Sequence, residues 1–327
     1  MKRVMRFLRL ALLGILCLLG LLVALLGYFV YTPDPQIPQL SGTFSKTSLE
    51  VGGLTRSYLT YVPKGLPPRA PLVVVMHGSG EGPQGIRRGT GYAFERLADQ
   101  HGFAVVYPKS YASDWNDCSR IGDKELAGVT ADDAGFLAAM VDKLVGELRL
   151  DPALVFATGI SNGGSMAMRL ALEQPGRYRA VAAVGANVPP VKNLQCKPAA
   201  QATSVMIMNG TEDPLVPYEG GEINLLGLFY RGGPITSSRA SAQYFADWAH
   251  LVGAPHTSEK TVAEGVRVEQ NRWGADGAKT KIELVTIHGG GHGLPQPYAL
   301  RPRLLGPSPM EPDGSALIWD FFARQPK

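Results

Sequence analysis

The chain has 327 residues, 45% of them hydrophobic, and a formal net charge of +4 from 32 basic and 28 acidic residues. Four basic residues, Lys2, Arg3, Arg6 and Arg9, lie in the N-terminal tail, so the rest of the chain is close to neutral. This balance argues against a nucleic-acid partner, and the length favours one large α/β domain over two small ones.

An unbroken apolar run follows the basic tail, over residues 10–30. At about 1.5 Å per residue, a helix of this length spans a bilayer core roughly 30 Å thick. Residues 28–33 offer no clear small-residue cleavage site, so we favour an uncleaved membrane anchor, with a removed signal peptide as the alternative. Because the basic tail stays in the cytoplasm, the body is exported. It is then anchored to the cytoplasmic membrane, facing the periplasm or the outside, or secreted if the segment is cleaved.

The residues after the apolar run predict an extended tether, because they include three prolines, Pro33, Pro35 and Pro38. The tether separates the membrane segment from the folded body of the chain. The expected divisions are an N-terminal membrane anchor or signal sequence (1–31), a Pro-rich linker (32–42) and one folded domain (43–327).

Three cysteines are present, and Cys17 falls within the apolar segment. Cys118 and Cys196 remain in the exported body and are a candidate disulfide; two unpaired thiols are the alternative. Two cysteines alone cannot form a zinc site, and the sequence has no H-E-x-x-H or C-x-x-C motif. We therefore expect no metal.

Buried strands alternate with helices from residue 72 onward, which predicts a mostly parallel central sheet with helices on both faces. The first two strands have no helix between them and predict an antiparallel N-terminal edge. Asp132 and Asp133 are interpreted as helix-capping residues rather than as a catalytic carboxylate pair. The expected strands are residues 43–51, 56–62, 72–76, 103–107, 154–158, 180–185, 205–208, 266–273 and 281–287, and the expected helices are residues 91–100, 130–150, 165–172, 240–252 and 315–324.

A candidate nucleophile lies in the sequence Gly159-Ile160-Ser161-Asn162-Gly163, which reads G-x-S-x-G. A β-type run precedes it and a helix-forming run follows it. A serine on a sharp turn between strand and helix projects its hydroxyl out of the fold, and the glycines permit the turn. This context predicts that Ser161 is a catalytic nucleophile.

A serine hydroxyl needs a base, and six histidines are candidates. We favour His292, because it follows the last strand within a run of glycines that would let a loop present the ring. His288 is the rival, but at the strand end its side chain is expected to pack or hydrogen-bond locally.

The acid that orients the base is expected after a strand between the nucleophile and the base. Asp213 and Glu212 both qualify by position, directly after residues 205–208. We choose Asp213, which Pro214 holds in place, although an Asx-turn cap would explain it as well. The order Ser161, Asp213, His292 is that of the α/β-hydrolases.

The oxyanion of a tetrahedral intermediate needs two backbone N–H donors. One is expected from Asn162, which follows the nucleophile at a helix N-terminus. The other is expected from Ser79, in the His77-Gly78-Ser79-Gly80 loop after the strand at residues 72–76. His77 is interpreted as a structural residue that supports this loop.

Several of these segments together resemble the polyhydroxybutyrate depolymerase and feruloyl esterase-type family of the α/β-hydrolase superfamily. The resemblance covers roughly residues 43–322 and implies an α/β-hydrolase fold and carboxylic-ester hydrolysis through an acyl-enzyme, with no cofactor. It carries the catalytic roles onto Ser161, Asp213 and His292. The segments are His77-Gly78, Trp115-Asn116-Asp117, Asp132-Asp133 with Gly135-Phe136, Gly159 to Gly164, Asn209 to Asp213 with Val216-Pro217-Tyr218 and Gly220-Gly221, and Gly289 to His292.

The chain also departs from the family pattern, because Gly293-Leu294-Pro295 stands where a tryptophan often follows the catalytic histidine. Trp115 is a candidate aromatic wall for the substrate, with core packing as the alternative. Residues 225–230 are a candidate lid, with a short buried helix as the alternative. The tether suggests small, diffusing esters, although oligomeric esters stay open, and feruloyl, acetyl, hydroxyalkanoate and lipid esters are all compatible with the sequence.

Two other functions are compatible with the same residues. A serine peptidase of this fold would use the same triad, although the sequence shows no clear acidic pocket for a peptide amine. A catalytically inactive binding module tethered to the membrane is the second, and the intact candidates at every catalytic position argue against it.

Overall fold

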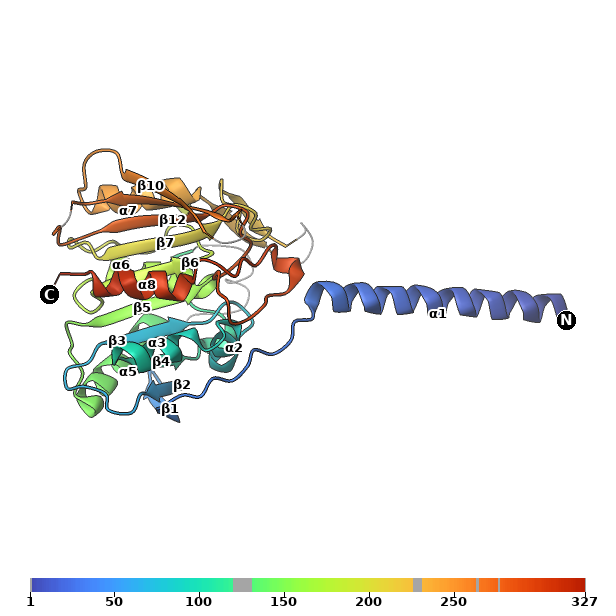
Figure 1. Cartoon of the computed structure of the whole chain (residues 1–327), viewed down its shortest axis with the longest axis horizontal. Helices are drawn as coiled ribbons and strands as arrows, with labels where there is room; N and C mark the ends of the chain where they lie inside the picture. The colour runs from blue at the N-terminus through green and yellow to red at the C-terminus, as the bar shows by residue number, and fades with distance from the viewer. Residues whose placement is uncertain (1, 120–130, 226–230, 263–264, 276, 327) are drawn as a thin grey trace.

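The computed structural model describes residues 2–119, 131–225, 231–262, 265–275 and 277–326. A ten-stranded sheet forms its centre, with the strand order β1-β2-β4-β3-β5-β6-β7-β12-β11-β10 (Figure 1). The six strands from β4 to β12 in this order are parallel to one another, and antiparallel strands flank them on both sides. The strands are β1 (Thr43–Val51), β2 (Leu54–Val62), β3 (Leu72–Met76), β4 (Ala104–Pro108), β5 (Val155–Ile160), β6 (Ala180–Val184), β7 (Ser204–Gly210), β10 (His256–Thr261), β11 (Arg267–Trp273) and β12 (Ile282–Ile287).

Helices cover both faces of this sheet, because the parallel strands are apolar on both sides. In β3, Leu72, Val74 and Met76 pack into one core with α5, α6 and α7. Val73 and Val75 pack into a second core with α2, α3 and α8. The expected mostly parallel sheet with helices on both faces and an antiparallel N-terminal edge is therefore confirmed. The helices are α2 (Pro83–Gly89), α3 (Ala93–His101), α5 (Asp133–Leu148), α6 (Asn162–Glu173), α7 (Ser238–Trp248) and α8 (Gly314–Ala323).

Some elements carry too weak a sequence signal to be expected. Strand β10 is an edge strand with mostly exposed, polar residues, so it lacks the alternation that marks a half-buried strand. Helix α2 is short, begins with Pro83 and contains two glycines. A small hairpin of β8 (Gly221–Asn224) and β9 (Arg231–Ile235) also forms. Residues 226–230, most of the candidate lid, lie outside the described residues.

Asp132 caps α5 as expected, because its side chain accepts a hydrogen bond from the Gly135 N–H at 2.8 Å. Asp133 has a different role. It is buried in an ion pair with Arg56 and accepts a hydrogen bond from the Asn116 N–H at 2.7 Å. The interpretation of both acids as caps is therefore right for Asp132 alone, and Asp133 joins β2 to the segment before α5.

The N-terminal helix α1 (Lys2–Val30) projects away from the sheet (Figure 1). Among the described residues it is the one helix whose length and apolar composition suit a membrane span. Its side chains are exposed from residue 3 to residue 30, and an isolated apolar helix of this kind is unfavourable in water.

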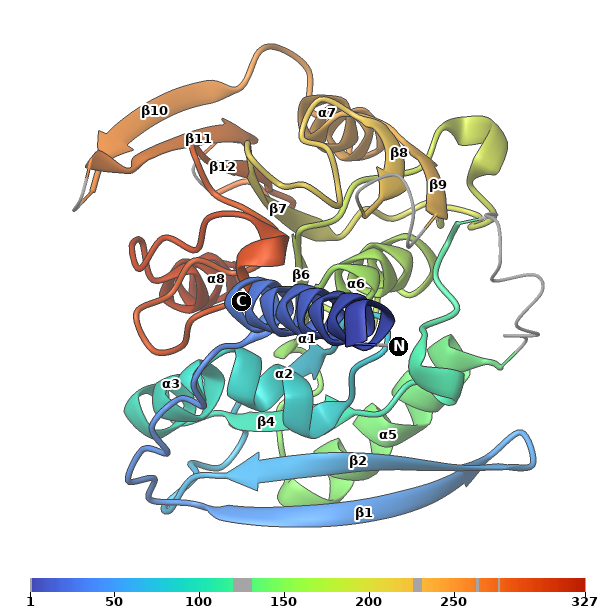
Figure 2. The ribbon, with the colours of Figure 1, turned by 90° about the vertical axis from the view of Figure 1, so that its right-hand side faces the viewer.

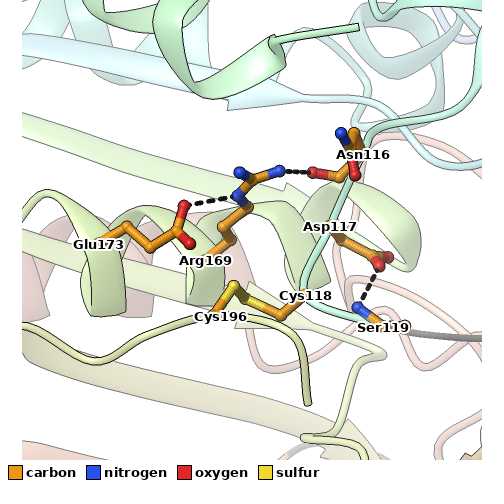
Figure 3. The surroundings of a disulfide bond; sticks show 7 residues. All are labelled: Asn116, Asp117, Cys118, Ser119, Arg169, Glu173 and Cys196. Atoms are coloured by element: carbon orange, nitrogen blue, oxygen red, sulfur yellow. Dashed lines mark hydrogen bonds and ion pairs between the residues drawn. A yellow bond between two sulfur atoms is a disulfide. The ribbon is translucent and has the colours of Figure 1, made fainter. Parts of the chain in front are cut away.

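Cys118 and Cys196 form a disulfide, with their Cα atoms 5.0 Å apart (Figure 3). The two segments also pair through their backbones, because the Gln195 N–H donates to the Cys118 carbonyl at 2.8 Å. Beside the bridge, Arg169 of α6 donates to the Asn116 carbonyl and pairs with Glu173. The disulfide therefore ties the 115–118 segment to the segment around Cys196, while Arg169 links the 115–118 segment to α6.

Replacing both Cys118 and Cys196 by alanine should lower the free energy of unfolding by roughly 4 kcal/mol, because the bridge closes a long loop in the unfolded chain. The two cysteines are 78 positions apart. Urea unfolding of the full chain in detergent micelles measures the change. Cys17→Ser, at an exposed free cysteine, is the matched control and should leave the unfolding midpoint unchanged. A loss below about 1 kcal/mol in the double variant would contradict the assigned contribution.

Candidate active site

Ser161 lies on the sharp turn between β5 and α6. Its backbone has φ 57° and ψ −123°, a conformation that costs a non-glycine residue of order 1–3 kcal/mol. Neighbouring backbone holds the turn: the Ser161 N–H donates to the Val184 carbonyl at 2.8 Å. A Cβ atom on Gly163 would overlap the Met76 and His77 carbonyls, so only glycine lets the turn approach the end of β3.

Asp213 follows β7 and His292 follows β12, and their side chains meet. The His292 Nδ1 lies 2.8 Å from the Asp213 Oδ2, with both residues buried. The other carboxylate oxygen accepts the Leu215 and Val216 N–H groups, each at 2.8 Å. Because an ionised carboxylate only accepts hydrogen bonds, the pairing places the ring proton on Nδ1 and leaves Nε2 as an acceptor.

Ser161 and His292 line one pocket of about 380 Å³. Gly78 and Ser79 of the loop after β3 line the same pocket. Strands β3, β5, β7 and β12 run in the same direction, so their carboxyl ends meet at one edge of the sheet. The structure thereby brings together side chains that are far apart in the chain.

The rival residues lie elsewhere. The His288 Nδ1 is 2.9 Å from the Arg267 guanidinium, and its Nε2 is 3.5 Å from a Glu269 carboxylate oxygen. Glu212 is exposed, whereas Asp213 is buried. His292 is among the described residues that line the pocket, and His288 is not.

The two expected oxyanion donors flank the serine. Asn162 is the first residue of α6, and its side chain is fixed by hydrogen bonds to the Trp115 backbone and to the Asp117 carboxylate. A Cβ atom built on Gly78 would lie 3.5 Å from the Ser161 Cβ, so the loop that carries Ser79 passes close to the nucleophile. The backbone N–H of Asn162 and that of Ser79 remain the expected donors.

A sequence profile of the family described as esterase PHB depolymerase matches residues 56–219, which include Ser161 and Asp213. The chain belongs to this family. Family membership and the α/β-hydrolase architecture make the protein a carboxylic ester hydrolase, as the resemblance implied.

Relatives of the chain include proteins with several ester substrates in their names. NocK of Nocardia uniformis subsp. tsuyamanensis, named as a proposed esterase, is 28% identical over 89% of this chain and 86% of its own. Poly(3-hydroxyalkanoate) depolymerase C of Paucimonas lemoignei is 25% identical over 72% of this chain but 58% of its own length. The solved acetyl xylan esterase of Aspergillus awamori shares the fold, with a TM-score of 0.55, 18% identity, and coverage of 76% of this chain and 94% of that one.

Trp115 does not form a wall of the esterase pocket. It is fully buried, is absent from the described residues that line the pocket, and donates its indole N–H to the His77 carbonyl at 2.9 Å. Its backbone also binds the Asn162 side chain. The alternative of core packing therefore describes Trp115, which supports the loops around the nucleophile.

His77 supports the loop after β3, as expected. Its Nδ1 lies 2.7 Å from the Gly78 carbonyl, and its Nε2 accepts the Ser110 N–H at 3.1 Å. The carbonyl can only accept, so Nδ1 carries the proton and Nε2 does not. Burial lowers the pKa of His77 below its usual range, and the neutral ring is the form that these partners require.

His77→Gln should flatten the dependence of stability on pH below about pH 6.5. The unfolded chain binds a proton at His77 in this range and the folded chain does not, so the wild-type free energy of unfolding falls as the pH is lowered. The slope from one such group is at most about 1.4 kcal/mol per pH unit. Urea unfolding at a series of pH values measures it, and equal slopes in both proteins would contradict the neutral ring.

Sequence reasoning missed the contribution of the segment after His292. Arg301 lines the pocket and donates to the His292 carbonyl at 3.2 Å, and Leu305 accepts the His292 N–H at 2.7 Å with its own carbonyl. A side chain on Gly293 would overlap the Arg301 guanidinium. The sequence feature that could have indicated this contribution is Gly293, which lies where the family often has a tryptophan after the histidine. Because glycine has no side chain, it leaves room for the Arg301 guanidinium.

Proposed function

We propose that the protein is a serine carboxylic-ester hydrolase that acts through an acyl-enzyme. The observation that carries the proposal is the buried 2.8 Å pairing of Asp213 with His292, a residue that lines the same pocket as Ser161. Each of the three residues follows a different strand of the parallel sheet, and a merely structural role would not require their convergence.

In the proposed reaction, His292 Nε2 takes the Ser161 proton while Ser161 Oγ attacks the ester carbonyl. The Asn162 and Ser79 N–H groups stabilise the oxyanion of the tetrahedral intermediate. As this intermediate collapses, His292 returns the proton to the leaving alcohol, and an acyl-Ser161 ester remains. His292 then takes a proton from water as the water attacks the acyl group, and it returns this proton to the Ser161 oxygen as the acid is released. Asp213 holds the ring and stabilises its charged form.

The substrates that we propose are small or oligomeric esters of the feruloyl, acetyl or hydroxyalkanoate type. The names of the relatives support this range, since they include feruloyl esterases, acetylxylan esterases and a hydroxyalkanoate depolymerase. The pocket volume of about 380 Å³ suits a small ester or the end of an oligomer.

We also propose that residues 1–31 anchor the protein, that residues 32–42 form a linker and that residues 43–327 are the catalytic domain. The apolar helix α1 and the disulfide between Cys118 and Cys196 support export to a disulfide-permissive compartment. The proposed location is the outer face of the cytoplasmic membrane, with secretion as the alternative if the segment is removed.

A comparison of esters with amides tests the reaction class. The full chain in detergent should hydrolyse p-nitrophenyl acetate and methyl ferulate, and it should leave aminoacyl p-nitroanilides essentially uncleaved. Preferential cleavage of the anilides would favour the peptidase alternative. If no substrate is cleaved and a fluorophosphonate probe does not react, the protein is instead an inactive binding module.

A further inference from the structure

The end of the apolar helix α1 lies beside the rim of the catalytic pocket. Arg303 donates a hydrogen bond to the Tyr28 carbonyl at 2.9 Å, and its guanidinium lies 4.4 Å from the centre of the Tyr28 ring. Arg303 opens the short helix η4 (Arg303–Leu305), and Leu305 lines the pocket. The helix therefore leaves the body beside the pocket. It points away from the body (Figures 1 and 2).

The tether itself forms part of the pocket wall. Thr32, two residues after the end of α1, lines the catalytic pocket together with Ser161 and His292. Thr32 also lines an adjoining pocket of about 660 Å³, and Leu300 is common to both. The next residues stay close to the body, since Asp34 lies 3.4 Å from the Arg88 guanidinium. The linker is thus docked at the mouth of the active site.

The position of the bilayer surface follows from the sequence around the end of α1. Tyr28, Phe29 and Tyr31 are exposed aromatic residues, which favour the interface between membrane and water. The two residues from Val30 to Thr32 span at most about 7 Å. The headgroup layer on each side of a bilayer is roughly 5–8 Å thick. With α1 across the bilayer, as proposed above, Thr32 and with it the wall of the pocket would lie at the level of the headgroups.

Apolar side chains outside the helix are also exposed, one in the linker and one among the residues that line the pocket. Ile37 of the linker is 78% exposed, and Leu300 at the pocket mouth is 52% exposed. Contact with a lipid surface would bury these apolar side chains, which are otherwise exposed to water. The continuity of this face with α1 identifies the lipid surface, rather than a second protein, as its partner.

We propose that the catalytic pocket opens onto the bilayer that holds α1, and that its substrates are amphiphilic esters resident in the outer leaflet. The apolar chain of such a substrate stays among the lipids while its ester group enters the pocket between Thr32 and Leu300. This inference rests on the proposed function and replaces the expectation of diffusing esters. Because enzyme and substrate share one surface, the tether raises the frequency of their encounters.

The test uses the full chain reconstituted in phosphatidylcholine vesicles and two substrates. One is the water-soluble p-nitrophenyl acetate, and the other is 4-methylumbelliferyl oleate dissolved in the vesicle membrane. The readout is the ratio of the oleate rate to the acetate rate, which cancels differences in the fraction of active protein. An insertion of about twelve Gly/Ser residues between Tyr31 and Thr32 keeps the anchor but frees the body to move roughly 20 Å from the membrane.

The insertion should lower this ratio at least tenfold, and Arg303→Ala should lower it severalfold by releasing η4 from Tyr28. Arg69→Ala, which removes an exposed ion pair with Asp151 at the other end of the sheet, is the matched control and should leave the ratio unchanged. An unchanged ratio in the insertion variant, or hydrolysis of the acetate without the oleate, would overturn the membrane-facing site and leave the esterase intact. If the wild-type protein hydrolysed neither the acetate nor the oleate, the proposed function itself would be contradicted.

Discussion

Ser161→Ala should reduce kcat/KM for p-nitrophenyl acetate by about 10⁴-fold or more, since loss of a triad nucleophile has effects of this order. The variant keeps the oxyanion donors and the pairing of His292 with Asp213, so only the attacking atom is lost. Initial rates on purified wild-type and variant protein in detergent measure the difference. A variant that retains more than a tenth of the wild-type value would contradict the nucleophile assignment.

Thermal unfolding separates this loss from a folding defect. Alanine keeps the Cβ atom and therefore the strained backbone of Ser161, so its Tm should match that of the wild type. Ser161→Gly should be equally inactive but more stable by about 1 kcal/mol, because glycine tolerates φ 57° without strain. An equal loss of stability in both variants would show that the hydroxyl has a structural role.

Asp213→Asn should reduce kcat by about 10⁴-fold at neutral pH, the size seen when a triad acid is replaced by its amide. The amide oxygen would still accept the Leu215 and Val216 N–H groups, which leaves the NH₂ group facing His292. The ring would then have to accept at Nδ1 and carry its proton on Nε2, where it cannot take the Ser161 proton.

Glu212→Gln is the matched control, because Glu212 is adjacent, acidic and exposed. Its kcat should stay within twofold of the wild-type value. If Glu212→Gln were as inactive as Asp213→Asn, the two acids would have to be reassigned. Full activity in Asp213→Asn would remove the orienting acid from the mechanism.

The local elements of the site could be predicted because they depend on short sequence patterns. The turn at Ser161 follows from glycine spacing between an apolar strand and a helix, and the parallel strands determine which loops meet at one edge. The predictions for Asp213 and His292 relied on that topology, and the structure brings both residues together. The strained backbone of Ser161 and the close backbone approach at Gly163 are those that the G-x-S-x-G motif predicts.

The remaining features depend on tertiary packing that a sequence pattern does not contain. Trp115 could have lined the substrate pocket or packed in the core, and only its burial in the folded chain distinguishes the two. The residues that surround it come from segments distant in the chain. Arg301 reaches the pocket because a long proline-rich segment folds back over Gly293. The docking of Thr32 at the pocket joins the tether to the far C-terminal part of the chain. Such contacts have no local period or motif.

Peptide mapping after reaction with a fluorophosphonate probe is the most direct measurement of the proposed serine mechanism. Mass spectrometry of the labelled full chain should locate a single adduct on Ser161, and the adduct should be absent from Ser161→Ala. Labelling should be much slower in Asp213→Asn. An adduct on another serine, or no adduct on a protein that still hydrolyses esters, would contradict the account.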